Sequence, residues 1–380
     1  MINYTKHYID QKDIKQVVVS LKSNFISQGK FLKKLEQNIQ SKFGCKYALA
    51  VSSGSAALHL AYKALGLNHN DYILTSTLTW VSTIDAALNC NADFDLLDID
   101  RSTFNVDVNK LKSYLERKTI KPKIFVPVHY AGLPCQMEEI HKICKKYNIK
   151  IVEDAAQGMG SKINKNFVGN CSYSDVTIFS LQPTKSITSG EGGIILTNNK
   201  KIYQKAKMLR RHGAQKNLKY PWSEEITMLG YNYKIAEPNC ALALSQLKKI
   251  NKFIKLREKK FKLYQLMLTS VSKSILFQKI DYHLKSSYHL MVIKFKKNLS
   301  LKKKKLIFNY FSKNKINLTL KYLPIHMNKI FKNKFKNGNF ENSENFFKNS
   351  FCFPLYFSLT DKDIIKIFNY LKIIIKKYKL

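Results

Sequence analysis

The sequence predicts an α/β fold, with a large domain built on a mostly parallel sheet and a small α+β domain at the C-terminal end. Short apolar runs alternate with helical segments throughout residues 47–200, a pattern typical of a parallel sheet covered by helices on both faces. After residue 270 the composition becomes rich in Lys and Asn, and glycines almost disappear. A chain of 380 residues is long enough for two cores. We therefore expect residues 1–248 to form the large domain and residues 249–380 the small one.

The elements of the large domain follow from the spacing of apolar residues. Two helices are expected within residues 1–46, separated by Ser27-Gln28-Gly29. A short buried strand at 47–51 then leads into an alanine-rich helix that ends at Gly66. Further strands are expected at 72–75, 94–100, 124–129, 150–154, 175–179 and 194–197, and helices at 83–89, 138–147 and from 198 to Arg211. Residues 214–226 are expected to form an exposed loop.

In the C-terminal part, Pro238 predicts the start of one long amphipathic helix that reaches about Met267, because proline suits a first helical turn. Such a helix would bridge the two domains. Alternating apolar runs predict strands at 290–295 and 318–322, and helical periodicity predicts helices at 302–311 and 361–378. These elements together indicate a small α+β domain.

The composition is typical of a globular enzyme, with 45% hydrophobic and 12% aromatic residues. No apolar run reaches the length of a membrane span, and the first residues lack the pattern of a signal peptide. We therefore expect a cytoplasmic protein with no membrane partner. The 7 cysteines form no CxxC pair and the 9 histidines no HExxH motif, so we predict free thiols and no metal site.

The chain is strongly basic, with 65 Lys and Arg against 26 Asp and Glu and a formal charge of +39. Such a charge is compatible with a nucleic-acid-binding protein. No RNP, zinc-finger or basic-zipper pattern accompanies it, and the lysines crowd after Lys248 among many Asn, Ile, Phe and Tyr. Compositional drift explains this distribution better, and an anionic substrate such as a nucleotide sugar would benefit from the charge. We expect no nucleic-acid partner.

The turn between the runs 175–179 and 194–197 carries the strongest chemical signal. It contains Pro183, three glycines and a single lysine, Lys185, held between two expected strand ends. Another apolar run ends in Asp154, and ligands of open α/β sheets collect outside such strand ends. A lysine amine and a carboxylate are the two protein groups that pyridoxal phosphate (PLP) requires. A lone lysine in such a turn would otherwise be a surface residue.

Residues 52–61 add an expected anion site, because a strand leads through Gly54 and Ser55 into a helix whose free N–H groups attract negative charge. Taken alone, these serines would merely cap the helix. Beside Lys185 and Asp154, a phosphate is the better interpretation. Trp80 follows another strand end and could stack on a pyridine ring, although a tryptophan there is more often part of the core.

Seven segments together resemble the DegT/DnrJ/StrS family of sugar aminotransferases, which have the aspartate-aminotransferase fold, fold type I of PLP enzymes. They recur in the family's order from about residue 10 to 360: 52–58, 79–83, 153–157, 179–185, 190–193, 211–213 and 230–233. One departure is clear, because Ser180-Leu181-Gln182 replaces the family's usual Ser-Phe-His. Family members that remove a hydroxyl carry His in place of Lys185, so the lysine favours amine transfer.

The resemblance implies roles for individual residues. Lys185 would hold PLP and later move the proton. The other residues implied to contact PLP are Gly54, Ser55, Trp80, Asp154, Gln157, Ser180 and, from the neighbouring subunit, Asn232. That last assignment implies a homodimer with shared active sites. By position, Arg211, His212 and His326 are candidates for binding the substrate, each with the alternative of a surface or helix-end role.

Within the family, the segments 127–132, 221–222, 229–233 and 322–326 are most similar to transaminases of pseudaminic acid synthesis. The resemblance therefore implies amine transfer from glutamate to C4 of a UDP-linked 4-keto-6-deoxy-N-acetyl-L-altrosamine. Alternatives are another UDP- or dTDP-keto sugar, such as a precursor of legionaminic acid or 4-amino-arabinose, and a PLP-binding regulator without catalysis. Lys185 and Asp154 count against the regulator.

Overall fold

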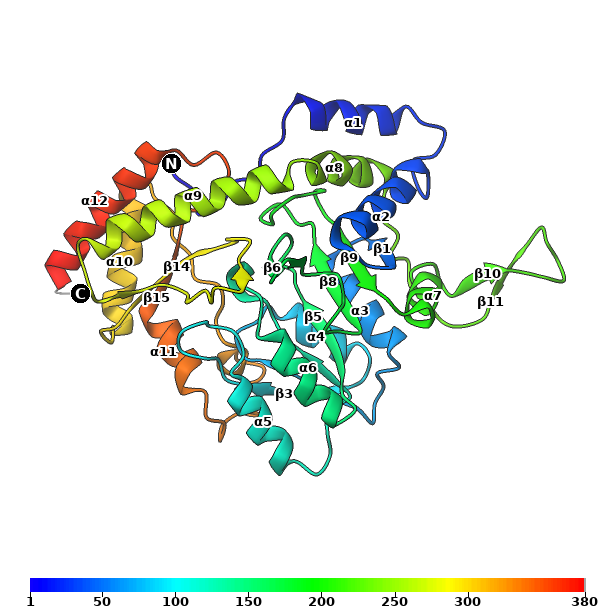
Figure 1. Ribbon diagram of the computed structural model, residues 1–380, viewed down its shortest axis with the longest axis horizontal. Coiled ribbons are helices and arrows are strands. Elements are labelled where there is room, and N and C mark those ends of the chain that lie inside the picture. The colour runs from blue at the N-terminus through cyan, green and yellow to red at the C-terminus, as the bar shows by residue number, and fades with distance from the viewer. Residues whose placement is uncertain (379–380) are drawn as a thin grey trace.

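The computed structural model describes residues 1–378 and is organised around a seven-stranded sheet with the strand order β1-β9-β8-β5-β4-β2-β3 (Figure 1). Strands β8, β5, β4, β2 and β3 are mutually parallel, whereas β9 is antiparallel to both β8 and β1. The strands span Tyr47–Val51 (β1), Tyr72–Ser76 (β2), Asp93–Leu97 (β3), Ile124–Val126 (β4), Lys150–Asp154 (β5), Val176–Ser180 (β8) and Gly193–Thr197 (β9). The predicted α/β class is confirmed.

Both faces of the sheet are covered, because successive residues of a strand point to opposite faces. In β1, Leu49 and Val51 join one hydrophobic cluster, whereas Ala48 and Ala50 join the other. The first cluster packs against α3 (Gly54–Ala64), α4 (Ser82–Leu88) and α7 (Lys200–Leu209). The second packs against α2 (Lys30–Phe43), α5 (Val108–Arg117), α6 (Met137–Lys146) and α8 (Glu237–Leu247).

A second, three-stranded sheet with the order β12-β14-β15 lies in the C-terminal part. Its strands span Ile275–Leu276 (β12), Met291–Phe295 (β14) and Ser350–Phe353 (β15), and its helices are α9 (Ile250–Thr269), α10 (Leu301–Lys313), α11 (Glu341–Asn349) and α12 (Asp361–Tyr378). The strand predicted at 318–322 is wrong, because only Thr319 makes an isolated bridge, to Cys352. Residues 321 and 322 instead face the cavity described below.

The single long helix predicted from Pro238 is also wrong, because the chain breaks it into α8 and α9 at Lys248 and Lys249. Lys249 lies at the break and forms ion pairs with Asp10 (2.7 Å) and Asp13 (2.8 Å), which flank the start of α1 (Gln11–Leu21). No glycine or proline marks this break, so apolar spacing alone could not reveal it.

The predicted loop at 214–226 contains a short hairpin formed by β10 (Ala214–Lys216) and β11 (Glu224–Ile226), which projects from the body of the molecule (Figure 1). Three more short strands form a small sheet with the order β13-β6-β7. They span Lys162–Ile163 (β6), Asn166–Phe167 (β7) and Leu284–Lys285 (β13). Since β13 pairs with β6, the C-terminal part is also joined to the large sheet region through backbone hydrogen bonds.

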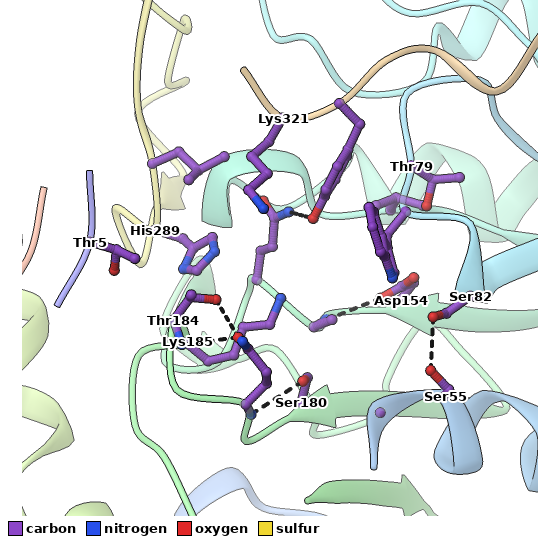
Figure 2. A pocket seen from close by; sticks show the side chains of 18 of the residues that line it. Thr5, Ser55, Thr79, Ser82, Asp154, Ser180, Thr184, Lys185, His289 and Lys321 are labelled. Carbon is purple, nitrogen blue, oxygen red and sulfur yellow. Dashed lines mark hydrogen bonds between the residues drawn. The ribbon is translucent and has the colours of Figure 1, made fainter. Parts of the chain in front are cut away.

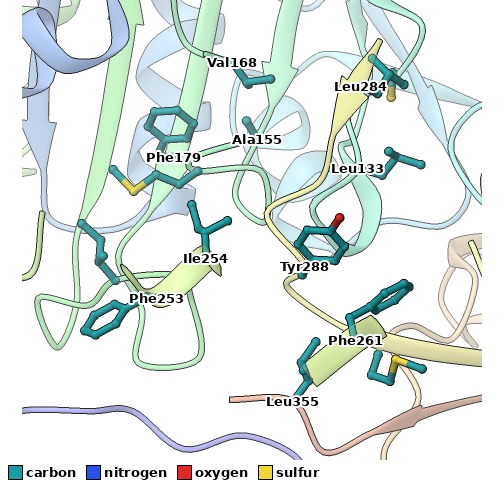
Figure 3. Packing of buried hydrophobic residues seen from close by; sticks show 14 of the residues in the cluster. Leu133, Ala155, Val168, Phe179, Phe253, Ile254, Phe261, Leu284, Tyr288 and Leu355 are labelled. Carbon is teal, nitrogen blue, oxygen red and sulfur yellow. The ribbon is translucent and has the colours of Figure 1, made fainter. Parts of the chain in front are cut away.

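The division at residue 248 stays a prediction, because one hydrophobic cluster includes residues from both sides of it. Figure 3 shows Ile254 of α9 pointing toward Phe179 of β8 and Ala155. A side chain at Gly160 would lie within 2.1 Å of Ile254 Cδ1, so the missing side chain lets α9 pack closely here. Within residues 1–378, no helix has both the length and the apolar character needed to cross a membrane.

Glu237 ties the start of α8 to the start of α2. Its carboxylate is fully buried and accepts hydrogen bonds from the backbone N–H groups of Gly29 (2.9 Å), Phe31 (2.7 Å) and Leu32 (3.0 Å). These are N–H groups that the helix itself leaves unpaired, and Gly29 offers no side chain to satisfy them.

We expect Glu237→Gln to lower the free energy of unfolding by about 2–4 kcal/mol. The glutamine amide carries no charge, and its N–H group would face the backbone N–H donors at the start of α2. Urea denaturation at fixed protein concentration measures this change. Glu116→Gln, at an exposed position on α5, is the matched control and should have no measurable effect. Equal midpoints for the two variants would show that Glu237 does not cap α2.

Candidate active site

A cavity of about 330 Å³ opens at the carboxyl ends of the central strands, between the start of α3 and segments of the C-terminal part. Figure 2 shows the side chains that surround it. The sequence-predicted residues that line the cavity are Gly54, Ser55, Trp80, Asp154, Gln157, Ser180 and Lys185. All seven therefore meet at one place, as their strand-end positions predict.

Lys185 reaches the cavity because β8 and β9 are antiparallel neighbours and the chain between them must turn over the sheet edge. Hydrogen bonds close this turn: Leu181 N–H donates to Gly192 O (2.9 Å), and the Thr188 hydroxyl donates to Leu181 O (2.9 Å). Gln182, where the sequence departs from the usual family pattern, accepts a bond from Thr184 N–H (2.9 Å). Its amide thus orders the segment just before the lysine.

Removal from water lowers the pKa of Lys185 to about 8. The charge of Lys321 lowers this pKa further, whereas Asp154 and Glu191 partly oppose the shift. A larger fraction of the amine is therefore neutral near pH 7 than in an exposed lysine. A neutral amine is a nucleophile and can also accept a proton.

Asp154 ends β5 and is buried beside Lys185. One carboxylate oxygen accepts from the Thr83 hydroxyl (2.7 Å), and the other accepts from Ala156 N–H (3.1 Å). Thr83 also contacts the Thr79 hydroxyl at 2.8 Å, and Thr79 must donate there because the Thr83 proton is directed at Asp154. The carboxylate is therefore held in one orientation.

The start of α3 forms an anion cradle next to these groups. Ser53 caps the helix by accepting from Ala56 N–H (3.0 Å), whereas Ser55 donates to Ser82 (2.8 Å) at the cavity wall. A side chain at Gly193 would lie 2.2 Å from Ser53 O, so only glycine lets β9 approach this turn. Helix dipole and hydroxyls together suit a phosphate.

Trp80 and Gln157 occupy other walls of the cavity. The Trp80 side chain is half exposed, and its ring centroid lies 5.4 Å from that of Tyr322. Gln157 donates to the Tyr322 hydroxyl (2.7 Å) and accepts from Ala131 N–H (2.7 Å). Burial and the charge of Asp154 raise the pKa of Tyr322, so its hydroxyl stays protonated.

Four predicted residues do not line the cavity. Arg211 is exposed and pairs with Glu224 of the hairpin, and His212 is exposed beside it. Asn232 is exposed and bridges Arg211 through the backbone. His326 is buried, and its Nδ1 contacts the Thr77 hydroxyl at 2.6 Å. Their assignments to phosphate and substrate stay predictions.

Sequence reasoning gave no role in the site to the N-terminal and C-terminal residues that line the cavity. Five of them carry polar side chains: Tyr4, Thr5, His289, Lys321 and Tyr322. Tyr4 is held against the C-terminal part because its carbonyl accepts from Leu355 N–H (3.2 Å). Apart from Tyr322, which begins the loop 322–326 noted above, these residues belong to no motif, and only the fold reveals that they face the site.

Residues 7–372 match the sequence model of the DegT/DnrJ/EryC1/StrS aminotransferase family. The chain belongs to this family. It is a PLP-dependent sugar aminotransferase with fold type I, and PLP is its cofactor. Its substrates are accordingly a sugar and an amino donor.

Individual relatives agree with this family. A Campylobacter jejuni protein named UDP-4-amino-4,6-dideoxy-N-acetyl-beta-L-altrosamine transaminase is 33% identical over 381 residues, covering 100% of this chain and 99% of that protein. Helicobacter pylori PseC, an aminotransferase involved in pseudoaminic acid biosynthesis, has a TM-score of 0.87 at 25% identity, covering 99% of each chain. Spr1654 of Streptococcus pneumoniae in its PMP form reaches 0.91 at 23% identity, covering 99% of this chain and 100% of that one, and supports the fold alone.

The residues of this aminotransferase fit PLP. The cavity contains a primary amine of lowered pKa, an oriented carboxylate, and a helix N-terminus with two nearby serine hydroxyls. An aldehyde, a pyridine nitrogen and a phosphate are the groups these side chains suit.

When the protein is mixed with PLP and then reduced with borohydride, we expect the pyridoxyl group to become attached to Lys185. Because its pKa is lowered to about 8, the neutral amine increases as the pH rises, so the rate of attachment should rise between about pH 6 and 8 and then level off. Peptide mass spectrometry locates the label.

Two other lysines give an internal control for this labelling. Lys260 and Lys304 also have pKa values lowered to about 8, but they donate to backbone carbonyls outside the cavity. Label on either of them, or undiminished label in Lys185→Arg, would contradict the assignment.

Proposed function

We propose that this aminotransferase moves an amino group from glutamate to C4 of UDP-4-keto-6-deoxy-N-acetyl-L-altrosamine. The observation that carries the proposal is the meeting of Lys185, of lowered pKa, with the oriented Asp154 carboxylate in one cavity. The substrate is supported by the names of the Campylobacter jejuni relatives, which are 33% and 32% identical to this chain.

In this proposal, the Lys185 amine would hold the aldehyde of PLP, and Asp154 would hold the ring nitrogen. The start of α3, with Gly54, Ser55 and Ser180, would hold the phosphate. Trp80 would contact the ring, and Gln157 would lie near it. When bound, PLP supplies an aldehyde and a ring that accepts the electrons released at the donor carbon.

Lys185 has two successive tasks in this account. Its amine would hold the cofactor through the aldehyde. Once free, the same amine, of lowered pKa, would accept a proton from the donor carbon and return it to a neighbouring carbon. Asp154, held in one orientation by two donors, would face the ring nitrogen and accept a hydrogen bond from it.

A different keto sugar is the second candidate. An Escherichia coli protein named GDP-perosamine synthase is 31% identical over 261 residues, which cover 68% of this chain and 69% of that protein. This relative supports a substrate whose sugar is linked to GDP and not to UDP. The two candidates differ in product mass.

We expect the PLP-loaded protein, given glutamate and a panel of UDP-, dTDP- and GDP-linked 4-keto sugars, to aminate the UDP-linked N-acetyl-altrose sugar fastest. Mass spectrometry detects the product and 2-oxoglutarate. Lys185→Ala should reduce turnover by a factor of at least about 10³, since it removes both the cofactor bond and the proton carrier. Faster amination of another sugar would exclude the proposed substrate, and a fully active Lys185→Ala would exclude the proposed mechanism.

We further propose a homodimer, supported by two exposed apolar surfaces. Helix α1 buries polar residues: Asp13 accepts from Ser245 (2.6 Å) and Gln246 (2.6 Å) of α8. Its apolar side is exposed at Ile14, Val18 and Leu21. The hairpin region exposes Leu218, Trp222, Ile226 and Leu229. Exposed apolar surfaces of this kind mark interfaces, and a second copy of the chain would cover them.

Mixing two inactive variants tests whether the sites are shared. If Asn232 serves the partner's cavity, Lys185→Ala and Asn232→Ala dimers that are mixed and allowed to exchange subunits should regain about one quarter of wild-type activity, because half of the dimers then contain one intact site. Light scattering confirms the dimer. A monomer, or no regain of activity, would contradict shared sites.

A further inference from the structure

Lys321 is a charged residue that lines the cavity and is not among the residues proposed to hold the cofactor. The charged or titratable side chains that line this cavity, apart from the tyrosines, are Asp154, Lys185, Glu191, His289 and Lys321. Figure 2 shows Lys321 entering from the side opposite to Ser55 and Ser180, where the phosphate is proposed to bind. Lys321 therefore lies on the side of the cavity that remains for substrate.

The Lys321 ammonium keeps its hydrogen-bond donors free. Over residues 1–378 it has no hydrogen-bond or ion-pair partner, and it lies 5.5 Å from the Tyr4 ring centroid, 6.0 Å from that of Trp80 and 5.7 Å from that of Tyr322. Aromatic faces attract a cation without satisfying its N–H donors. The Tyr130 hydroxyl donates to the Lys321 carbonyl, which fixes the main chain.

His289 places a second free polar atom in the same cavity. Its Nδ1 is buried without a hydrogen-bond partner in the described chain, and only 6% of the residue is exposed. The backbone is fixed on both sides, by Ala131 O (2.9 Å) and by Arg257 (3.3 Å). Burial and the charges of Lys185, Arg257 and Lys321 lower the pKa of His289 well below its usual value, so the ring is neutral.

We propose that Lys321, with the neutral His289 beside it, binds the α-carboxylate of a dicarboxylic amino donor such as glutamate, an inference that rests on the proposed function. The reacting carbon of the donor must lie at the Lys185 amine, and its α-carboxylate is one bond away. Lys185 and Lys321 line the same cavity, so a donor bound at the Lys185 amine can also reach Lys321. A carboxylate offers acceptors to a lysine and an imidazole N–H together.

The diphosphate of the sugar substrate suits this position less well. In a nucleotide 4-keto sugar the reacting carbon and the diphosphate are on opposite sides of the sugar ring. With C4 at the Lys185 amine, the diphosphate would lie farther from Lys185 than a donor carboxylate does. A cation that shares the cavity with Lys185 is therefore better placed for the donor.

Glutarate tests the proposal, because it has both carboxylates of glutamate but no amine and cannot react. It is titrated by calorimetry into PLP-loaded wild type, Lys321→Gln and Lys321→Arg. We expect Lys321→Gln to bind glutarate about 10- to 100-fold more weakly, since a charge-assisted hydrogen bond is lost, and Lys321→Arg to retain most of the affinity. Lys142→Gln, which removes an exposed charge on α6, should match wild type.

A parallel titration with UDP distinguishes binding of the donor carboxylate from binding of the substrate diphosphate. UDP should bind Lys321→Gln and wild type equally well, and the cofactor absorbance of each variant reports that it is folded and loaded. Unchanged glutarate binding, or weaker binding of UDP alone, would overturn the proposal. If the wild type aminates a keto sugar from glutamate but Lys321→Gln binds glutarate as tightly as the wild type, only this inference is contradicted. If the wild type aminates no keto sugar, the proposed function itself is contradicted.

Discussion

The pairing of β8 with parallel β5 on one side and antiparallel β9 on the other determines where the chemistry occurs. Because β5 and β8 run in the same direction, Asp154 and Ser180 end at one edge of the sheet. Because β9 returns antiparallel, the turn that carries Lys185 must cross that edge. The backbone ladder thus brings together a carboxylate and an amine that lie on separate segments of the sequence. Side-chain hydrogen bonds, such as that from Thr83, then set their orientation.

The sequence was sufficient for the parts of the site that depend on regular structure. Apolar runs ending at Asp154 and Phe179 predicted parallel strands, and the structure has the ends of both strands, Asp154 and Ser180, at the cavity. Gly54 and Ser55 were expected at a helix start, which is where α3 begins. Such predictions succeed because the ends of strands and the starts of helices are marked by local sequence patterns.

The remaining wall of the site could not be predicted in the same way. Tyr4, His289 and Lys321 reach the cavity only because the N-terminal segment and the C-terminal part fold back over the sheet edge, and no spacing in the sequence records that contact. Charge composition was equally uninformative: Lys304 belongs to the run of four lysines at 302–305, yet it is buried and donates to Phe347 O. Three-dimensional packing decides which lysine is solvent-exposed, structural or directed at substrate.

The central claim is that Lys185 and Asp154 act on opposite ends of one PLP ring at this sheet edge. A crystal structure of the PLP-loaded protein tests it most directly. The account predicts a covalent bond from Lys185 Nζ to the cofactor, a hydrogen bond from the ring nitrogen to Asp154, and the phosphate at the start of α3. A ring bound away from Asp154, or a phosphate bound at Lys321, would contradict the account.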